Sequence, residues 1–173
     1  MAPRRLGDRG SLGAMRVAVL TISTSRAGGE GQDQGGSKLA DLARRLGGDA
    51  VEREVLVDDR ALIESRLRHW ADEEHCELIL TTGGTGLAPT DVTPEATAAV
   101  IDRPAPGIAE AIRQASQTHT DLWMLSRGLA GARGSTLIVN LPGNPASIDE
   151  TAPVLETALP HALALLRGER AGH

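Results

Sequence analysis

A glycine-rich run and two aspartates are the residues whose types and spacing could do chemistry in this chain. The run Thr82-Gly-Gly-Thr-Gly86 follows the apolar segment 77–81, and Asp91 lies shortly beyond it. Glycines let the backbone turn sharply and expose its amides to a ligand, because no side chain shields them. The sequence Thr93-Pro94-Glu95 then favours a helix start, with threonine as its cap, where orphan amides and the helix dipole attract negative charge. This unit is suited to bind a phosphate.

The aspartates Asp58 and Asp91 predict a divalent cation beside that phosphate. Two carboxylates repel a phosphate unless a cation lies between them, so we expect Mg²⁺ bound jointly with substrate oxygens. Phosphoryl or nucleotidyl transfer uses such an arrangement. Two plainer interpretations stay open, because Asp58-Asp59 could cap the following helix and the glycines could form a simple tight connection.

The elements that must position these residues alternate between strands and helices. Apolar patterns predict strands over 16–22, 51–57, 77–81 and 136–140, with a glycine-rich loop at 28–36. Helical spacing predicts helices over 39–46, 63–71 and 108–115 and from residue 93. An apolar C-terminal region follows, which Pro153 and Pro160 should divide into two helices. The order predicts an α/β fold, a three-layer α/β/α sandwich with a mostly parallel sheet.

Polar or small residues follow each predicted strand. In a parallel sheet, ligands bind beyond the carboxyl ends of the strands, so these residues should converge on one crevice. They are Ser23-Thr24-Ser25, Asp58-Asp59, the loop from Gly83 to Asp91, Asn140, and the turn Pro142-Gly-Asn-Pro145. Ser126-Arg127 and Arg133-Gly134-Ser135 flank a segment that could fold as a hairpin over this crevice. Their side chains suit an anionic substrate, although solvated loop polarity is an equal alternative.

Other candidate sites are weak. Gly31 to Lys38 resembles a P-loop but lacks the Gly-Lys-Ser/Thr order. The five histidines show no metal-ligand spacing, and Cys76 has no companion ligand. We therefore expect neither a Walker-type site nor zinc.

Composition narrows the partners, the compartment and the domain count. The net charge is −5, with two tryptophans and no phenylalanine or tyrosine, whereas a nucleic-acid platform needs basic stripes and stacking rings. No apolar run approaches the roughly 20 residues of a membrane span. One cysteine cannot form an internal disulfide. We expect a cytoplasmic protein with no nucleic-acid or membrane partner: a disordered extension over 1–14, a single domain over 15–168 and a flexible tail over 169–173.

The motifs together resemble the molybdopterin adenylyltransferase family, the Mog/MoaB group that includes the gephyrin G domain. The resemblance extends from about Arg16 to about Gly168 and is carried by motifs in family-like order. They are Thr82-Gly-Gly-Thr-Gly86, Asp91-Val-Thr-Pro-Glu-Ala96, Leu125-Ser-Arg127, Gly134-Ser-Thr-Leu-Ile138 and Asn140-Leu-Pro-Gly143.

The resemblance implies a homotrimer that transfers AMP from Mg-ATP to molybdopterin and releases pyrophosphate. A molybdate-inserting protein would then collect the product. By position, Asp58 and Asp91 match the functional aspartates and would hold Mg²⁺. The other implied site residues form two sets: Thr82, Gly83, Gly84, Thr85, Gly86 and Ser135 toward the nucleotide phosphates, and Ser23, Ser126, Arg127, Pro142, Gly143, Asn144 and Pro145 in the substrate pocket.

Departures from the family pattern leave an alternative function. Many relatives have proline where this chain has Val57, and often aspartate where it has Thr24. The alternative is a non-catalytic MoaB-type protein that binds molybdopterin or serves as a scaffold, and the retained Asp58 and Asp91 argue against it. The molybdate-inserting and competence-damage domains have similar folds but usually belong to longer chains.

Overall fold

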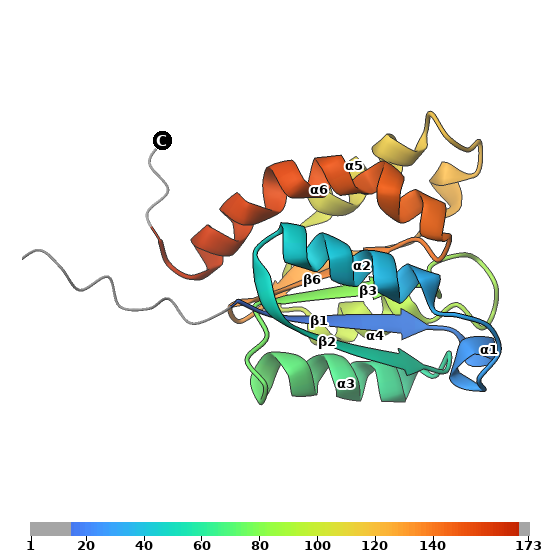
Figure 1. Cartoon of the computed structure of the whole chain (residues 1–173), viewed down its shortest axis with the longest axis horizontal. Coiled ribbons are helices and arrows are strands. Elements are labelled where there is room, and N and C mark those ends of the chain that lie inside the picture. The colour runs from blue at the N-terminus through green and yellow to red at the C-terminus, as the bar shows by residue number, and fades with distance from the viewer. Residues whose placement is uncertain (1–14, 170–173) are drawn as a thin grey trace, which may run out of the picture.

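The computed structural model describes residues 15–169, which form a three-layer α/β/α sandwich (Figure 1). Its sheet has six strands in the order β2-β1-β3-β6-β5-β4. Four strands pair in parallel, and β5 pairs antiparallel with both β6 and the edge strand β4. The predicted fold class is therefore confirmed, and two short strands are added to the prediction. The strands are β1 (Met15–Ile22), β2 (Gly48–Leu56), β3 (Leu78–Thr82), β4 (Arg103–Pro104), β5 (Ala130–Arg133) and β6 (Thr136–Leu141).

Helices cover both faces of the sheet. Figure 1 shows α2, α5 and α6 on one face and α3 and α4 on the other. Their bounds are α1 (Thr24–Ala27), α2 (Gln34–Arg45), α3 (Arg60–Asp72), α4 (Thr93–Val100), α5 (Pro106–Ser116) and α6 (Pro145–Leu166), with a 3₁₀ turn η1 (Trp123–Leu125). None of the helices within 15–169 is long and apolar enough to cross a membrane.

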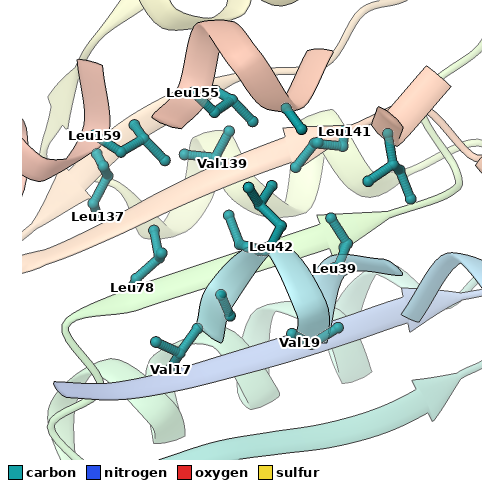
Figure 2. Packing of buried hydrophobic residues seen from close by; sticks show 14 of the residues in the cluster. Val17, Val19, Leu39, Leu42, Leu78, Leu137, Val139, Leu141, Leu155 and Leu159 are labelled. Atoms are coloured by element: carbon teal, nitrogen blue, oxygen red, sulfur yellow. The ribbon is translucent and has the colours of Figure 1, made fainter. Parts of the chain in front are cut away.

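The sheet separates two hydrophobic clusters. Successive strand residues point to opposite faces, so Val17 and Val19 join the cluster under α2 and α6, whereas Ala18 and Leu20 join the cluster against α3 and α4. Figure 2 shows the first cluster, in which leucines of α2 and α6 pack on valines and leucines of the central strands. Burial on both faces explains why these strands read as continuous apolar runs.

Helix α2 begins earlier than the sequence predicts, since Gln34, Gly35 and Gly36 belong to the helix rather than to a loop. Close packing explains the glycines. A Cβ on Gly35 would lie 3.2 Å from Cγ2 of Thr82, and one on Gly36 would lie 2.7 Å from Oγ1 of Thr21. The Asp33 side chain caps the helix by accepting from the Gly36 amide at 2.8 Å.

Helix α6 is continuous over 22 residues, so the predicted division at its prolines is wrong. Both Pro153 and Pro160 lie on the exposed face, where water can satisfy the carbonyls that lose an amide partner. The opposite face holds the helix together with buried residues at helical spacing. These are Ile148, Ala152, Leu155, Leu159 and Leu163.

The predicted domain bounds remain predictions. Residues 15–169 hold one sheet and its covering helices. The extension predicted over 1–14 and most of the tail predicted over 169–173 lie outside the described residues.

Strand β2 is shifted from the predicted 51–57, since it runs from Gly48 to Leu56. Close packing explains the glycine at its start, where a Cβ would lie 2.8 Å from a Val17 methyl group.

Candidate functional site

The carboxyl ends of the parallel strands lie on one edge of the sheet, toward α1 in Figure 1. Ser23 follows β1, Asp58 follows β2, the glycine loop (residues 83–91) follows β3, and the turn 142–145 follows β6. The predicted crevice residues therefore share this edge, with the exceptions given below.

The glycine loop requires glycine at its start. Gly83 and Gly84 have positive φ angles of 98° and 64°. A Cβ on Gly83 would lie 2.2 Å from the carbonyl oxygen of Ile22, and one on Gly84 would lie 2.4 Å from Oγ1 of Thr93. Both angles are strained for other residues, and both positions have no space for a side chain.

Asp58 lies against this loop. Its Oδ2 accepts hydrogen bonds from the amide and the hydroxyl of Thr24, at 3.0 and 2.7 Å. A Cβ on Gly84 would lie 3.3 Å from Oδ1 of Asp58, so this second oxygen faces the glycine loop. The neighbouring Asp59 caps α3 by accepting from the amide of Leu62 at 3.0 Å. The capping interpretation therefore holds for Asp59 alone.

Asp91 lies at the other end of the loop. Its Oδ2 accepts from the Ala88 amide at 3.1 Å, and a Cβ on Gly86 would lie 2.8 Å from that oxygen. Its Oδ1 accepts no hydrogen bond within residues 15–169. Asp58 and Asp91 thus flank the glycine loop, each with one oxygen that accepts no hydrogen bond from residues 15–169.

Carboxylate oxygens of this kind are the ligand type that a hard divalent cation prefers. No group of three or more His, Cys, Asp or Glu side chains within 15–169 could hold a metal ion by itself. Oxygens of a substrate and of water would have to complete the shell, which is the usual situation for Mg²⁺ at phosphate sites.

Thr93 holds the loop rather than capping its helix, contrary to the sequence prediction. It is the first residue of α4, after an N-cap at Val92 that makes no side-chain cap bond. Its amide donates to the carbonyl of Gly84 at 3.1 Å and its hydroxyl to that of Gly83 at 2.9 Å. The N-terminus of α4 is thereby fixed beside the loop.

The backbone amides of residues 84–87 donate no hydrogen bond to another group of the described chain. Successive unpaired amides at a glycine turn form a concave site for anions. They are the donors that the sequence predicts for a phosphate.

Two cavities are lined by predicted site residues, and one of them includes the first glycine of the loop. One of about 70 Å³ contains Ser23, Gly83 and Gly143, together with Arg26 and Asp33. The other, of about 90 Å³, contains Ser126, Pro142, Trp123 and Ser147 in its wall. Predicted pocket residues therefore line both cavities.

Two residues of the turn after β6 contribute differently. Asn144 caps α6 through its side-chain oxygen, which accepts from the Ala146 amide at 3.1 Å, and Pro145 is the first residue of that helix. Asn140 lies within β6 and is buried at 2% exposure, so it does not face the crevice. Its amide group donates to the hydroxyls of Thr81 and Thr97.

Ser135 is also a predicted site residue that the structure does not bring to the crevice. It lies between β5 and β6, directly before the first residue of β6. Since β6 is parallel to β3, its start lies at the opposite edge of the sheet from the glycine loop. The direction of the strand was available from the sequence and could have placed Ser135 there.

Arg127 reaches the glycine loop but is occupied by protein groups. Its Nε donates to the Gly86 carbonyl at 2.7 Å, its Nη2 to the Asp91 carbonyl at 2.8 Å, and its Nη1 to the Glu95 carboxylate. The guanidinium holds the pKa of Glu95 below its usual value, chiefly through this hydrogen bond. These donors bond protein groups rather than the anionic substrate that the sequence predicts for Arg127.

Sequence reasoning placed Thr24 at the crevice and Thr93 at a helix start but missed the contacts by which they support the site. Thr24 holds Asp58 and Thr93 holds the loop, and single threonines carry no pattern that predicts such contacts. Asp33 could have been found as the polar residue before a helix.

Comparison with known proteins identifies a family whose matched region spans the site described above. A family model described as "Probable molybdopterin binding domain" matches residues 18–161. This chain belongs to the MoaB/Mog family. The family resemblance inferred from the sequence is thus confirmed.

Individual relatives agree with the MoaB/Mog assignment. The chain is 36% identical over 156 residues to the molybdopterin adenylyltransferase of Helicobacter pylori J99, covering 89% of each chain. It is 39% identical over 154 residues to the molybdenum cofactor synthesis protein cinnamon of Drosophila melanogaster, covering 88% of this chain but only 26% of that protein. The crystal structure of the molybdopterin biosynthesis enzyme MoaB from Thermus thermophilus is similar with a TM-score of 0.80 and 44% identity, covering 90% of this chain and 98% of that one.

Proposed function

We propose that this MoaB/Mog-family protein is a molybdopterin adenylyltransferase, which transfers AMP from Mg-ATP to the phosphate of molybdopterin in molybdenum cofactor biosynthesis. The observation that carries the proposal is the glycine loop with unpaired amides between Asp58 and Asp91. The similarity to adenylyltransferases over 89% of the chain supports it.

The reaction exchanges one phosphorus–oxygen bond for another. An oxygen of the molybdopterin phosphate attacks the α-phosphorus of ATP, the bond to the bridging α–β oxygen breaks, and pyrophosphate leaves. A phosphate monoester loses its second proton with a pKa of about 6, so the nucleophile is already ionised at neutral pH. No general base is required, and the residues that line the two cavities include no histidine.

The chain contributes alignment and charge stabilisation. Amides of the glycine loop bind phosphate oxygens, and Asp58 and Asp91 are the residues that would hold Mg²⁺. When bound, the ion neutralises charge that develops on the phosphate oxygens. Thr24 keeps the Asp58 carboxylate in place through its two hydrogen bonds.

Each of the two cavities is proposed to receive a portion of the organic part of a substrate. Ser23 and Gly143 line the first, and Ser126 and Pro142 line the second. Trp123 in the wall of the second offers a ring against which a flat heterocycle can stack.

The setting is proposed from the family resemblance. The protein acts in the cytoplasm as a homotrimer and passes adenylylated molybdopterin to a molybdate-inserting protein. Light scattering tests the trimer, and a monomeric mass contradicts it.

Mass spectrometry under anaerobic conditions tests the activity. Molybdopterin is incubated with Mg-ATP and the wild-type protein or its Asp91→Asn variant. Adenylylated molybdopterin from the wild type alone supports the proposal. A folded wild type that binds molybdopterin without yielding this product contradicts it and favours the scaffold function.

A further inference from the structure

Arg127 fastens the glycine loop at three points and the first turn of α4 at a fourth. Its amide donates to the Thr85 carbonyl at 2.8 Å, and its guanidinium bonds the carbonyls of Gly86 and Asp91 and the carboxylate of Glu95. Within residues 15–169, every hydrogen bond that ties residues 85–91 to another segment of the chain is made by Arg127. Arg127 precedes β5, so the loop is tied to a different part of the sheet.

The bonded carbonyls determine where the loop amides point. In a trans peptide the N–H points away from the carbonyl of the same peptide unit, and no peptide bond here is cis. The carbonyls of Thr85 and Gly86 point to Arg127. The amides of Gly86 and Leu87 therefore point to the opposite side, and these are amides without a protein partner.

The charge of Arg127 is also neutralised within the protein. Glu95 lies on the first turn of α4, and its Oε1 pairs with the guanidinium. Its other oxygen, Oε2, is buried and has no hydrogen-bond partner within the described chain. Arg127 is thus the one partner that holds this carboxylate against the loop.

We infer that Arg127, oriented by Glu95, is a positioning residue that aims the loop amides and Asp91 at the nucleotide phosphates without contacting them. The inference rests on the proposed function only in naming a nucleotide as the ligand. It assigns to Arg127 a task different from that of a substrate-binding arginine.

The Glu95→Gln variant separates these two tasks by the sign of its effect. If Arg127 contacted ATP, loss of the Glu95 carboxylate would free its guanidinium and would also remove the repulsion between Glu95 and the phosphates. A substrate-contacting role therefore predicts tighter binding of Mg-ATP. The positioning role predicts weaker binding, because the pair that fixes the loop is lost. We expect the Kd of Mg-ATP, measured by calorimetry, to rise about fivefold.

The Arg127→Lys variant tests the geometry rather than the charge. An ammonium can pair with Glu95, but it cannot bond Glu95 and both loop carbonyls from the fixed directions of a guanidinium fork. We expect its Mg-ATP affinity to fall toward that of Arg127→Met. Wild-type affinity in Arg127→Lys overturns the inference, as does tighter binding in Glu95→Gln.

A matched control lies at the other edge of the sheet. Arg133 donates to both oxygens of Asp72 and to the Val100 carbonyl, so it also joins a carboxylate to backbone. Asp72→Asn should change thermal stability without changing the Kd of Mg-ATP. An equal loss of affinity in Asp72→Asn shows a general stability effect and overturns the inference.

The wild type distinguishes this inference from the proposed function. Binding of Mg-ATP without formation of adenylylated molybdopterin contradicts the function, while the variants still decide the role of Arg127. Absence of Mg-ATP binding by the wild type overturns both.

Discussion

Similar residues have different roles at the two edges of the sheet that are formed by the carboxyl ends and by the amino ends of the parallel strands. At each edge a glycine with positive φ lies in a turn, an aspartate accepts a backbone amide and an arginine pairs with a carboxylate. At the amino ends of β3 and β6, however, the amide of Gly134 donates to Asp102 and both oxygens of Asp72 are bonded. At the carboxyl ends, loop amides and one oxygen each of Asp58 and Asp91 have no partner in the part of the chain that the structure describes.

This difference separates a structural edge, at the amino ends of the parallel strands, from a binding edge, at their carboxyl ends. Polar groups that satisfy each other stabilise the fold and leave nothing for a ligand, whereas unpaired donors and acceptors require water or a ligand. The thiol of Cys76, directly before β3, is inert as well, because burial raises its pKa to about 11. Residue type alone therefore does not identify a site, and the state of its hydrogen bonds does.

Replacing one glycine at each edge with alanine should give the largest difference between the two edges in the free energy of unfolding. In Gly83→Ala the new Cβ collides with the Ile22 carbonyl, so we expect a loss of about 3 kcal/mol or more in the free energy of unfolding and loss of activity. In Gly134→Ala the Cβ meets no atom within 4 Å, so only the positive φ costs energy, about 1 kcal/mol. Denaturant titration compares them, and equal losses would remove the distinction between the turns.

Aspartate-to-asparagine changes separate function from folding. Asp91→Asn keeps an acceptor for the Ala88 amide but loses its charge, so we expect turnover to fall about 100-fold or more while stability changes by less than about 1 kcal/mol. Asp102→Asn at the other edge should leave turnover within about twofold. Steady-state assays and thermal melts on both proteins test this. If Asp91→Asn unfolds the protein, its effect on turnover has no catalytic meaning.

Acid pH should weaken both carboxylate–arginine pairs. Arg127 lowers the folded-state pKa of Glu95 and Arg133 lowers that of Asp72, in each case chiefly through a side-chain hydrogen bond. A lowered pKa gives stability that is present above the unfolded-state pKa of about 4 and is lost as the pH falls through the folded-state value. Because the carboxylate side chains of Glu95 and Asp72 are more than a third exposed, each pair should contribute less than about 1 kcal/mol to the free energy of unfolding.

The two variants should flatten this pH dependence in different measurements. Between about pH 5 and pH 3, Asp72→Asn should reduce the decline in unfolding free energy only. Glu95→Gln should also reduce the decline in Mg-ATP affinity relative to wild type. Identical profiles for wild type and Glu95→Gln would show that the Glu95 pair does not act on the loop.

The sequence predicts this fold well because both signals on which it depends are local. Apolar runs mark strands buried on both faces, and residues after those strands mark the crevice, as Asp58 and the glycine loop demonstrate. Packing overrides local rules elsewhere. Pro153 stays inside α6 because its buried face holds the helix, and Gly35 belongs to α2 because the sheet approaches closely. Side-chain pairing cannot be read locally, so the roles of Thr93 and Arg127 required the structure.

Ser135 and Ser126 provide the smallest and most specific test. The sequence predicts that both face the substrates, but only Ser126 lines one of the two cavities proposed for them. Ser135 is exposed in the turn before β6, at the structural edge. We expect Ser135→Ala to keep turnover within about twofold and Ser126→Ala to lower it about tenfold, as loss of one substrate-facing hydroxyl does. Since neither change removes buried apolar area, melts should agree with wild type. A large loss in Ser135→Ala would mean that a second copy of the chain brings this edge to the crevice of its neighbour.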